Sequence, residues 1–370
     1  MELSYWEYKT WLSNIDFTII GSGIVGLSTS IFIKKRFPEA KVLILEKGIL
    51  PQGASTKNAG FACFGSISEV LSDLGSHSEA AVVQLVQKRF EGIQLLRSLL
   101  GDSSIGYEKF GGHELFLSSD KGLFEKCHAS ISRMNELLYP VFGKSVFKAT
   151  DNHFEFKQIQ EQYITHTEEG QIHTGQMMQG LLKLALQLGV EILNAVEVET
   201  YEEVGTGVLI KTNKFEFTTD KLMVTTNGFA SQWLQEPVKP ARAQVVITKP
   251  IQNLSIKGTF HLNEGYYYFR NIDNRILFGG GRNLDFEAEE TTTFGQTALV
   301  QKKLERLLKE VIIPNQPLEI DRRWSGIMGV GHEKKPIVKQ LSNKVYCGVR
   351  LGGMGIAIGS SVGKDLANLP

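Results

Sequence analysis

Short apolar runs and a helix-like repeat alternate at the start of the chain. Residues 17–20 and 41–45 are short, apolar and rich in β-branched side chains, which predicts two buried parallel strands. The apolar positions between residues 24 and 37 predict a crossover helix that Pro38 ends. This strand–helix–strand order is typical of a parallel sheet covered by helices.

Beyond this unit the pattern changes to an antiparallel series and returns to a strand and a helix at the end. A broad apolar face predicts a long helix over residues 79–100. Further helices are expected at 123–139 (ended by Pro140), 176–188, 295–310 and 355–369. Strands are expected at 110–117, 189–193, 196–201, 207–212, 215–218, 221–225, 245–248, 259–262, 266–270, 275–278 and up to 348, with a hairpin turn at Asp273-Asn274.

A glycine-rich turn joins the first strand to the first helix. Its residues, Gly21-Ser22-Gly23-Ile24-Val25-Gly26, have the G-x-G-x-x-G spacing of a dinucleotide-binding turn. Gly21 would make the tight turn, Gly23 would let a pyrophosphate approach the backbone, and Gly26 would let the helix pack on the strand. N–H groups at the helix start would face the phosphates. Glu46 follows the second strand, where the motif places the carboxylate that binds ribose hydroxyls. This acid disfavours NADP and leaves FAD and NAD open.

The order of elements predicts an α/β fold with an α+β second domain. A Rossmann-like dinucleotide-binding domain would be interleaved with a substrate domain built on an antiparallel sheet. A length of 370 residues suggests about two domains. We place the first domain at residues 1–75, 170–235 and 320–370, and the substrate domain at residues 76–169 and 236–319.

Composition narrows the classes of function. Lys plus Arg and Asp plus Glu both number 40, so a nucleic-acid partner is not indicated. Three scattered cysteines make neither a disulfide framework nor a zinc motif, and the histidines lack ligand spacing, so we expect no metal. The chain shows no membrane-spanning run and no signal peptide, and we expect a cytoplasmic protein. An aromatic lead-in is expected to pack on the domain or, alternatively, to make a peripheral membrane contact: Tyr5, Trp6, Tyr8 and Trp11.

Motifs along the whole chain carry a resemblance to one family. Besides the first glycine turn with Glu46, they are the loop 55–61 with its Asn58-Ala59-Gly60 core, Thr226-Asn227-Gly228 before Trp233, the segment 266–281, Trp324-Ser325-Gly326, and Gly353-Met354-Gly355-Ile356. In this order they resemble the FAD-dependent amine and amino-acid oxidoreductases of the D-amino-acid oxidase superfamily. The likeness is to the glycine oxidase, sarcosine oxidase and gamma-glutamylputrescine oxidoreductase side of that family.

The resemblance implies a function and a set of FAD-binding residues. It implies that the first domain binds FAD, and that hydride passes to flavin N5 from the C–N bond of an amine or amino acid. The resulting imine would then hydrolyse, and electrons would go on to oxygen or to a carrier. The matching FAD-binding positions are Gly21, Ser22, Gly23, Ile24, Val25, Gly26, Glu46, Lys47, Ser55, Thr56, Asn58, Ala59, Gly60, Phe61, Val198, Asn227, Gly228, Trp233, Gly326, Gly352, Gly353, Met354, Gly355 and Ile356.

Two positions depart from the family pattern. Met328 stands where members that act on small amino acids carry an arginine for the substrate carboxylate, and a thioether cannot form that ion pair. Either Arg350, Arg282 or Arg270 takes its place, or the substrate lacks that carboxylate. Gly326 matches the cysteine that attaches flavin in sarcosine-type enzymes, so we expect non-covalent FAD.

Four residues are candidates for the substrate side of the site. Tyr268 lies on a strand that faces the flavin in the family, Arg350 precedes the closing glycines, and His113 sits in an apolar strand. The fourth is Met328, because of its place in the family pattern. Tyr268, Arg350 and His113 each also have a structural explanation, as an aromatic-strand tyrosine, a surface arginine and a core histidine. No general base is assigned, because a substrate held close to flavin N5 can transfer hydride without one.

Two other functions stay open at this point. One is an FAD-dependent dehydrogenase of 2-hydroxy acids, which a substrate panel would separate from amine oxidation. The other is a flavoprotein whose FAD is mainly structural and which acts as a partner-binding or tRNA-modification-type module. The neutral overall charge argues against RNA as a partner of such a module.

Overall fold

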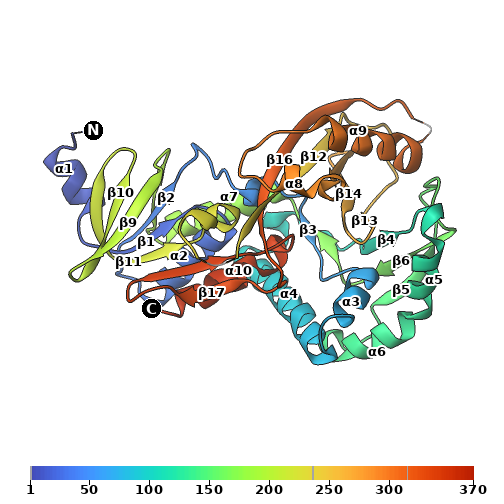
Figure 1. The fold of residues 1–370 in the computed structure, drawn as a ribbon, viewed down its shortest axis with the longest axis horizontal. Helices are drawn as coiled ribbons and strands as arrows, with labels where there is room; N and C mark the ends of the chain where they lie inside the picture. The colour runs from blue at the N-terminus through green and yellow to red at the C-terminus, as the bar shows by residue number, and fades with distance from the viewer. Residues whose placement is uncertain (1, 236, 315) are drawn as a thin grey trace.

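Two eight-stranded sheets organise the computed structural model, which describes residues 2–235, 237–314 and 316–370. Figure 1 shows them at the two ends of an elongated molecule, with α4 (Glu79–Leu100) between them. A small third sheet pairs β3 (Phe61–Ala62) with β7 (Gly170–Gln171). The chain passes between the two large sheets several times, because each takes strands from separate parts of the sequence.

The first sheet has the strand order β17-β18-β11-β1-β2-β8, and β10 and β9 continue from β11. Its strands are β1 (Ile15–Ile20), β2 (Val42–Glu46), β8 (Glu191–Asn194), β9 (Val198–Val204), β10 (Gly207–Thr212), β11 (Glu216–Val224), β17 (Ile337–Gln340) and β18 (Val345–Val349). β1 is parallel to both of its neighbours, β2 and β11. Strands buried on both faces in this way need continuous apolar runs, which explains the pattern at residues 17–20 and 41–45.

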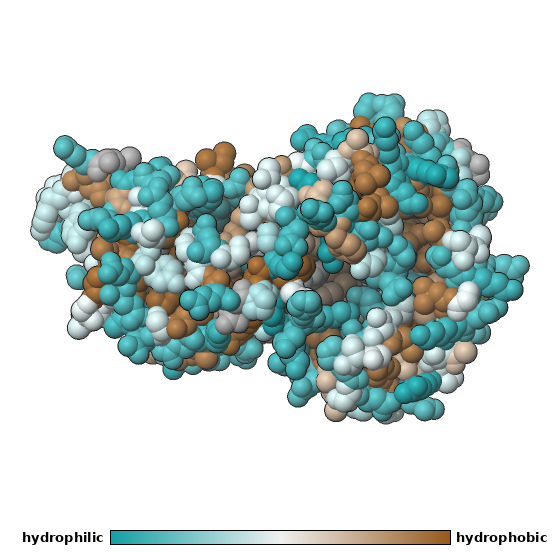
Figure 2. All heavy atoms as spheres, viewed as in Figure 1, coloured by the Kyte–Doolittle hydropathy of each residue, from teal (hydrophilic) through white to brown (hydrophobic). Residues whose placement is uncertain are grey.

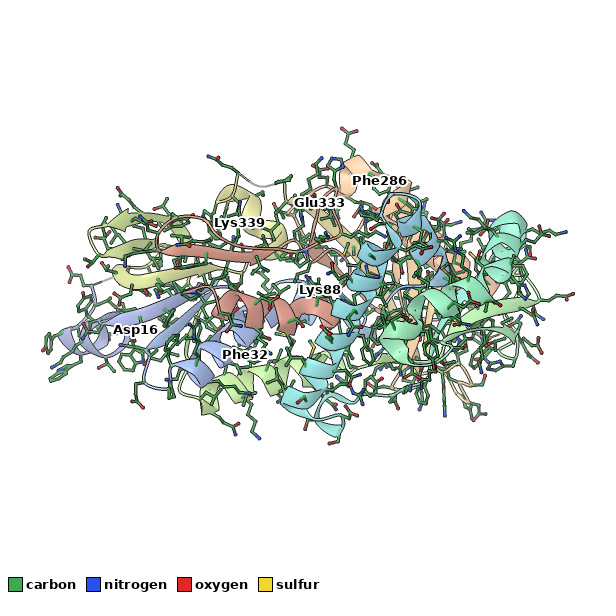
Figure 3. All side chains as sticks on the ribbon, turned by 90° about the horizontal axis from the view of Figure 1, so that it is seen from below. Asp16, Phe32, Lys88, Phe286, Glu333 and Lys339 are labelled. Carbon is green, nitrogen blue, oxygen red and sulfur yellow. The ribbon has the colours of Figure 1, made fainter. Side chains whose placement is uncertain are left out.

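Helices α2 (Ile24–Arg36), α7 (Thr174–Gln187) and α10 (Gly355–Ala367) pack with α4 around the largest apolar core. The approach of α4 to α10 is so close that a Cβ added to Gly92 would lie 1.9 Å from the carbonyl oxygen of Ala357. Figure 3 shows this crossing near Lys88 of α4. The second sheet is thereby fixed to the helical layer of the first.

The second sheet has the strand order β16-β12-β15-β14-β13-β4-β6-β5. Its strands are β4 (Gly112–Leu115), β5 (Phe147–Asp151), β6 (Gln162–His166), β12 (Lys239–Thr248), β13 (Thr259–Leu262), β14 (Tyr267–Ile272), β15 (Arg275–Gly280) and β16 (Ile320–Val330). All neighbours are antiparallel except β13 and β4. The division into two domains stays a prediction, and β16, which we placed with the first domain, pairs with β12 of the second sheet.

Shorter elements complete the fold. The remaining helices are α1 (Tyr5–Glu7), α3 (Ile67–Leu74), α5 (Lys121–Ala129), α6 (Ile131–Phe142), α8 (Phe286–Glu289) and α9 (Ala298–Leu307). Two π-helical turns are η1 (Tyr8–Leu12) and η7 (Leu308–Ile312), and the 3₁₀ turns are η2 (Ala54–Thr56), η3 (Ser103–Ile105), η4 (Ser118–Asp120), η5 (Asn227–Gln232) and η6 (Arg282–Leu284). Together, α9 and η7 cover one face of the second sheet through an apolar cluster.

Most predicted elements are confirmed, and the differences have local causes. The helix over residues 79–100 is confirmed. The helix predicted at 123–139 is wrong as a single element, because the chain turns at Ser130 and Pro140 lies inside the last turn of α6. The strands predicted at 215–218 and 221–225 form one strand, whose Thr219 hydroxyl donates to the Ile15 carbonyl oxygen. Helices α1, α3 and α8 and strands β3, β5, β6, β7 and β17 were not predicted.

The N-terminal segment is mostly exposed. Within residues 5–12, Leu12 is the buried residue, whereas Trp6 is 69% exposed. The segment packs on the domain through Leu12 and the partly buried Leu3, whereas its aromatic side chains are largely exposed, and the peripheral membrane contact stays a prediction. In the described ranges, no helix combines the length and the apolar character that crossing a membrane requires.

Two buried carboxyl groups, one on β4 and one in the turn between β6 and β7, accept hydrogen bonds from the segment before α4. Glu114 of β4 accepts hydrogen bonds from the backbone N–H of Ser68, at 3.0 Å, and from its hydroxyl. Glu169 accepts from the backbone N–H groups of Phe64 and Gly65 at 2.6 and 3.1 Å. Burial raises the pKa of each carboxyl to about 7, against the opposing effect of these hydrogen bonds.

We expect Glu114→Gln to change how stability depends on pH. The raised pKa means that the folded protein keeps a proton that the unfolded chain releases between pH 4.5 and about 7. Stability contributed by this group is therefore full below that range and is lost as the pH rises through it. Relative to the wild type, the variant should gain about 2 kcal/mol between about pH 5 and about pH 8. Urea unfolding at both pH values measures this, with the exposed Glu125→Gln as control. Identical pH dependence in variant and wild type would argue against it.

Candidate active site

One cavity of about 1210 Å³ reaches both glycine-rich turns. Its wall includes residues at or just after the carboxyl ends of parallel strands: Ile20, Glu46, Thr225 and Leu351. Ligands of open α/β sheets bind at this edge. The opposite wall comes from β12, β14 and β16 of the second sheet, and Figure 2 shows the surface hollowed between the two parts. The volume exceeds that of an ordinary small-ligand pocket.

The first glycine turn has the geometry that its sequence predicts. Gly21 has a φ of +101°, which favours glycine, and its N–H donates to the Leu45 carbonyl oxygen at 2.8 Å. A Cβ on Gly26 would lie 2.0 Å from the Gly21 carbonyl oxygen, so only glycine allows the helix this close. The Ser55 hydroxyl accepts a hydrogen bond from the Ile24 N–H at 2.9 Å and so joins the loop 53–61 to the helix start.

Glu46 is held in a fixed orientation at the end of β2. Its Oε2 accepts hydrogen bonds from the backbone N–H and the hydroxyl of Ser22, at 3.0 and 2.7 Å. Its Oε1 accepts from the Gly48 N–H at 2.9 Å. The carboxylate is buried yet lines the cavity. Beside it, Lys47 forms an ion pair with Glu197 across 2.5 Å, and Val198 continues the wall.

The second glycine turn leaves open space in front of its backbone. A Cβ added to Gly352 or Gly353 would meet no other atom within 4 Å, and Gly352 has a φ of +57°. The turn is held from behind, because the Gly352 N–H donates to the Gly329 carbonyl oxygen at 2.9 Å. α10 starts at Gly355 without a side-chain cap, so its first N–H groups are available to a ligand. Because the start of a helix carries partial positive charge, these N–H groups would stabilise a ligand group that becomes negatively charged.

The loop 53–61 enters the cavity between the two turns. The Asn58 carboxamide oxygen accepts hydrogen bonds from the Gly60 N–H and the Thr174 hydroxyl, both at 2.8 Å. From the second sheet, the Trp324 indole N–H donates to the Lys57 carbonyl oxygen at 2.9 Å. Gly326 lies against this loop, because a Cβ there would be 3.2 Å from the Lys57 Cβ. Both sheets thus fix the position of the loop.

An aromatic wall closes the cavity on the second sheet. Tyr268 lies over Gly279, whose added Cβ would be within 2.8 Å of the tyrosine hydroxyl oxygen. The ring of Phe61 contacts Tyr268 and His261 edge to face, with centroids 5.7 and 5.2 Å apart. Burial raises the pKa of Tyr268 to about 12, so the phenol stays protonated at neutral pH.

A family model described as FAD dependent oxidoreductase (DAO) matches residues 16–369. The chain belongs to this family. It is 20% identical to a probable oxidoreductase OrdL of Haemophilus influenzae over 97% of this chain and 83% of the relative. It is also 20% identical to gamma-glutamylputrescine oxidoreductase of Escherichia coli K12, over 96% of this chain and 83% of the relative. The crystal structure of an iminodiacetate oxidase from Chelativorans sp. BNC1 aligns with a TM-score of 0.77 and 18% identity, over 95% and 94%.

In this FAD-dependent oxidoreductase, most of the site residues predicted from the sequence line one cavity. All of them line it except Ser22, Gly26, Thr56, Gly228 and His113. The first four support the wall from behind. Ser22 orients Glu46, Gly26 packs on Gly21, and the Thr56 hydroxyl donates to the Pro51 carbonyl oxygen at 2.7 Å. A Cβ on Gly228 would lie 2.5 Å from the Met328 carbonyl oxygen, so this glycine packs η5 against β16.

The structure does not place His113 in the cavity, so its assignment as a catalytic candidate is corrected. Its Nδ1 lies 2.8 Å from the Thr165 hydroxyl, and its ring packs on Tyr163 and Phe260. Burial lowers the pKa of His113 to about 3, which keeps the ring neutral. It is a core histidine on the face of β4 that points away from the site.

The three arginines have different surroundings. Arg270 is buried and outside the cavity, and its Nη1 donates to the carbonyl oxygens of Gly60 and Ile172 at 3.2 and 2.6 Å. Arg350 lines the cavity but donates to the Lys335 carbonyl oxygen at 3.0 Å and pairs with Glu333 at 3.3 Å.

Of these three arginines, Arg282 is the one whose guanidinium group is available to bind a ligand. It lines the cavity and packs over the rings of Tyr266 and Phe286, with 5.8 and 5.1 Å between the guanidinium carbon and the ring centroids. Among the described residues its guanidinium group has no hydrogen-bonding or ion-pair partner. Figure 3 labels Phe286, over which Arg282 packs, and Glu333, with which Arg350 pairs.

Sequence reasoning missed several residues of the wall. Among them are Glu69 of α3, Arg89 of α4, His261 of β13 and Phe294. Glu69 had a local signal, because Ser66 and Glu69 have the spacing of a capping box and form one. His261 had none, because alternation along a strand does not tell which of its two faces lies on a cavity.

Proposed function

We propose that this chain oxidises the C–N bond of an amine or amino acid and that its FAD is bound without a covalent link. The observation that carries the proposal is the single cavity that joins the first glycine turn, the closing glycine turn and the aromatic wall of the second sheet. A dinucleotide and a small substrate both fit in a space of this size. When bound, FAD supplies a hydride acceptor at its ring.

The residues present suit FAD along the whole length of the cavity. Glu46 would bind the ribose hydroxyls, and the helix start at Gly23 and Ile24 would face the pyrophosphate. The ring would lie between the loop 53–61 and the closing turn, where Gly352 and Gly353 have open space in front of them. The backbone N–H groups at the start of α10 would stabilise negative charge there. Glycine at position 326 supports non-covalent binding, since it offers no sulfur.

The substrate would bind between the ring position and the aromatic wall. Tyr268 and Phe61 form an apolar surface that excludes water, and Arg282 would bind an anionic group of the substrate. Met328 also lines this space, where a thioether adds packing without charge. The relatives named after gamma-glutamylputrescine and iminodiacetate support a nitrogen compound as the substrate class.

Anaerobic titration of the FAD-loaded protein tests this function. A panel of primary amines, amino acids, N-substituted amino acids and 2-hydroxy acids is added in turn, and the visible flavin absorption is recorded. We expect one or more nitrogen compounds to bleach the flavin and 2-hydroxy acids to leave it oxidised. Readmitting oxygen, or adding an artificial electron acceptor, then tells which of the two reoxidises the enzyme. Bleaching by 2-hydroxy acids alone, or by no compound in the panel, would overturn the proposal.

A further inference from the structure

A polar corner of the cavity lies where α3 meets the hairpin between β13 and β14. Glu69 of α3 and His261 of β13 both line the cavity at this corner. A Cβ added to Gly265 of the hairpin would lie 3.9 Å from Glu69 Oε1 and 4.0 Å from His261 Nδ1. The two side chains therefore converge on one place, although they come from elements that are far apart in the sequence.

His261 is a buried histidine with unused hydrogen-bonding capacity. It is 8% exposed, and neither of its ring nitrogens has a hydrogen-bond partner within the described ranges; Nδ1 is the nitrogen on the side of Gly265. Burial lowers the pKa of His261, and the negative charge of Glu69 opposes this shift only in part. The ring is therefore neutral at physiological pH, with one nitrogen able to accept a hydrogen bond. Nε2 is enclosed by the protein, so Nδ1, at the corner beside Gly265, is the nitrogen that a ligand in the cavity can reach.

Glu69 has one carboxylate oxygen in a hydrogen bond with the protein and one that faces the cavity corner. Its Oε2 accepts a hydrogen bond from the Ser66 N–H at 3.1 Å, as the capping box of α3 requires. Among the described residues it forms no ion pair. The neighbouring cation, Arg89, is 3% exposed and donates to the Phe64 carbonyl oxygen at 2.7 Å. Oε1 of Glu69 is thus left facing the corner at Gly265.

We propose that Glu69 and His261 form a subsite that binds the protonated amine nitrogen of the substrate. The carboxylate provides the opposite charge, and the neutral imidazole accepts a hydrogen bond from the ammonium group. Arg282 also lines the cavity and packs over the ring of Tyr266, the residue that follows Gly265. The cavity therefore selects compounds that carry an ammonium group at one end and an anionic group at the other. This inference rests on the proposed function and adds to it the substrate class.

The experiment measures binding rather than turnover. n-Butylamine and n-butanol have the same chain length but differ in charge, and calorimetry gives the dissociation constant of each for the FAD-loaded protein. Glu69→Gln keeps the helix cap, because glutamine also serves at this position, and removes only the charge. We expect Glu69→Gln and His261→Phe to weaken butylamine binding by about 10-fold or more and to leave butanol within about twofold. The matched control is Glu7→Gln, which changes the corresponding residue of the exposed capping box at α1.

Three results would overturn the subsite: no measurable butylamine binding to the wild type, unchanged affinity in Glu69→Gln, or equal weakening of butylamine and butanol. The last of these would show a structural effect rather than recognition of charge. Failure of the proposed function has a different signature. There the wild type and variants would differ in butylamine affinity as expected, while no nitrogen compound reduces the flavin.

Discussion

Replacing Gly26 with alanine is expected to lower the affinity for FAD by about 10-fold or more. The added Cβ would lie 2.0 Å from the Gly21 carbonyl oxygen and 2.8 Å from the Thr225 hydroxyl oxygen. The first of these atoms is backbone, so no side-chain rotation relieves the contact, and the helix start must move away from the turn. Alanine favours a helix by only about 1 kcal/mol over glycine, which does not offset such a displacement. Titration of the apoprotein with FAD, followed by fluorescence, measures the change.

The matched control for this prediction is Gly122→Ala. Gly122 also lies in the first turn of a helix, α5, but it does not line the cavity, and a Cβ there would meet no other atom within 4 Å. We expect this variant to bind FAD as the wild type does. FAD affinity that is the same in Gly26→Ala and Gly122→Ala would argue against the role of this turn.

Glu289→Ala is expected to lower the free energy of unfolding by about 3 to 5 kcal/mol. Glu289 pairs with Arg242 of β12, with 2.8 Å between Nε and Oε2 and 3.0 Å between Nη2 and Oε1. Gln244 donates to the same carboxylate at 2.7 Å. Both charged side chains are buried, so the alanine variant leaves the guanidinium without a counter-charge in the interior. Urea unfolding of the FAD-loaded protein measures the effect.

The neighbouring residue supplies the control for this ion pair. Glu290 pairs with Lys239 at 2.9 Å, but both side chains are exposed, and such pairs contribute about 0 to 1 kcal/mol. Glu290→Ala should therefore change stability little. We also expect Glu289→Ala to weaken substrate binding, because the chain that follows it supplies Thr292, Thr293 and Phe294 to the cavity wall. Equal stability of the two variants would contradict the assignment of a buried network.

The parts of the fold that depend on local rules could be predicted from the sequence. The turn from Gly21 to Gly26 and the strands on either side of α2 follow from glycine spacing, β-branched runs and Pro38, which act over a few residues. The pairing of β1 with β11 could not be predicted in this way, because it joins segments some 200 residues apart. The same holds for the pairing of β16 with β12, because of which β16 belongs to the second sheet, although we placed it with the first domain.

The residues on the substrate side of the cavity could not be predicted from local sequence rules either. His113 and His261 both lie in short apolar strands, and the sequence gives no reason to prefer one of them. Across β4 and β13, His113 lies opposite Phe260, and Glu114 lies opposite His261. Because successive side chains of a strand point to opposite faces of the sheet, His113 lies in the aromatic core and His261 lies on the cavity. Which face of a strand meets a cavity depends on what packs on each side, and this is decided by distant parts of the chain.

We propose that FAD lies along one cavity from the first glycine turn to the closing one and is held without a covalent bond. The most direct test is the visible absorption of the purified protein before and after acid precipitation. We expect a flavin spectrum in the native protein and free FAD in the supernatant afterwards. A colourless protein that takes up no added FAD, or a flavin that stays with the precipitated chain, would contradict it.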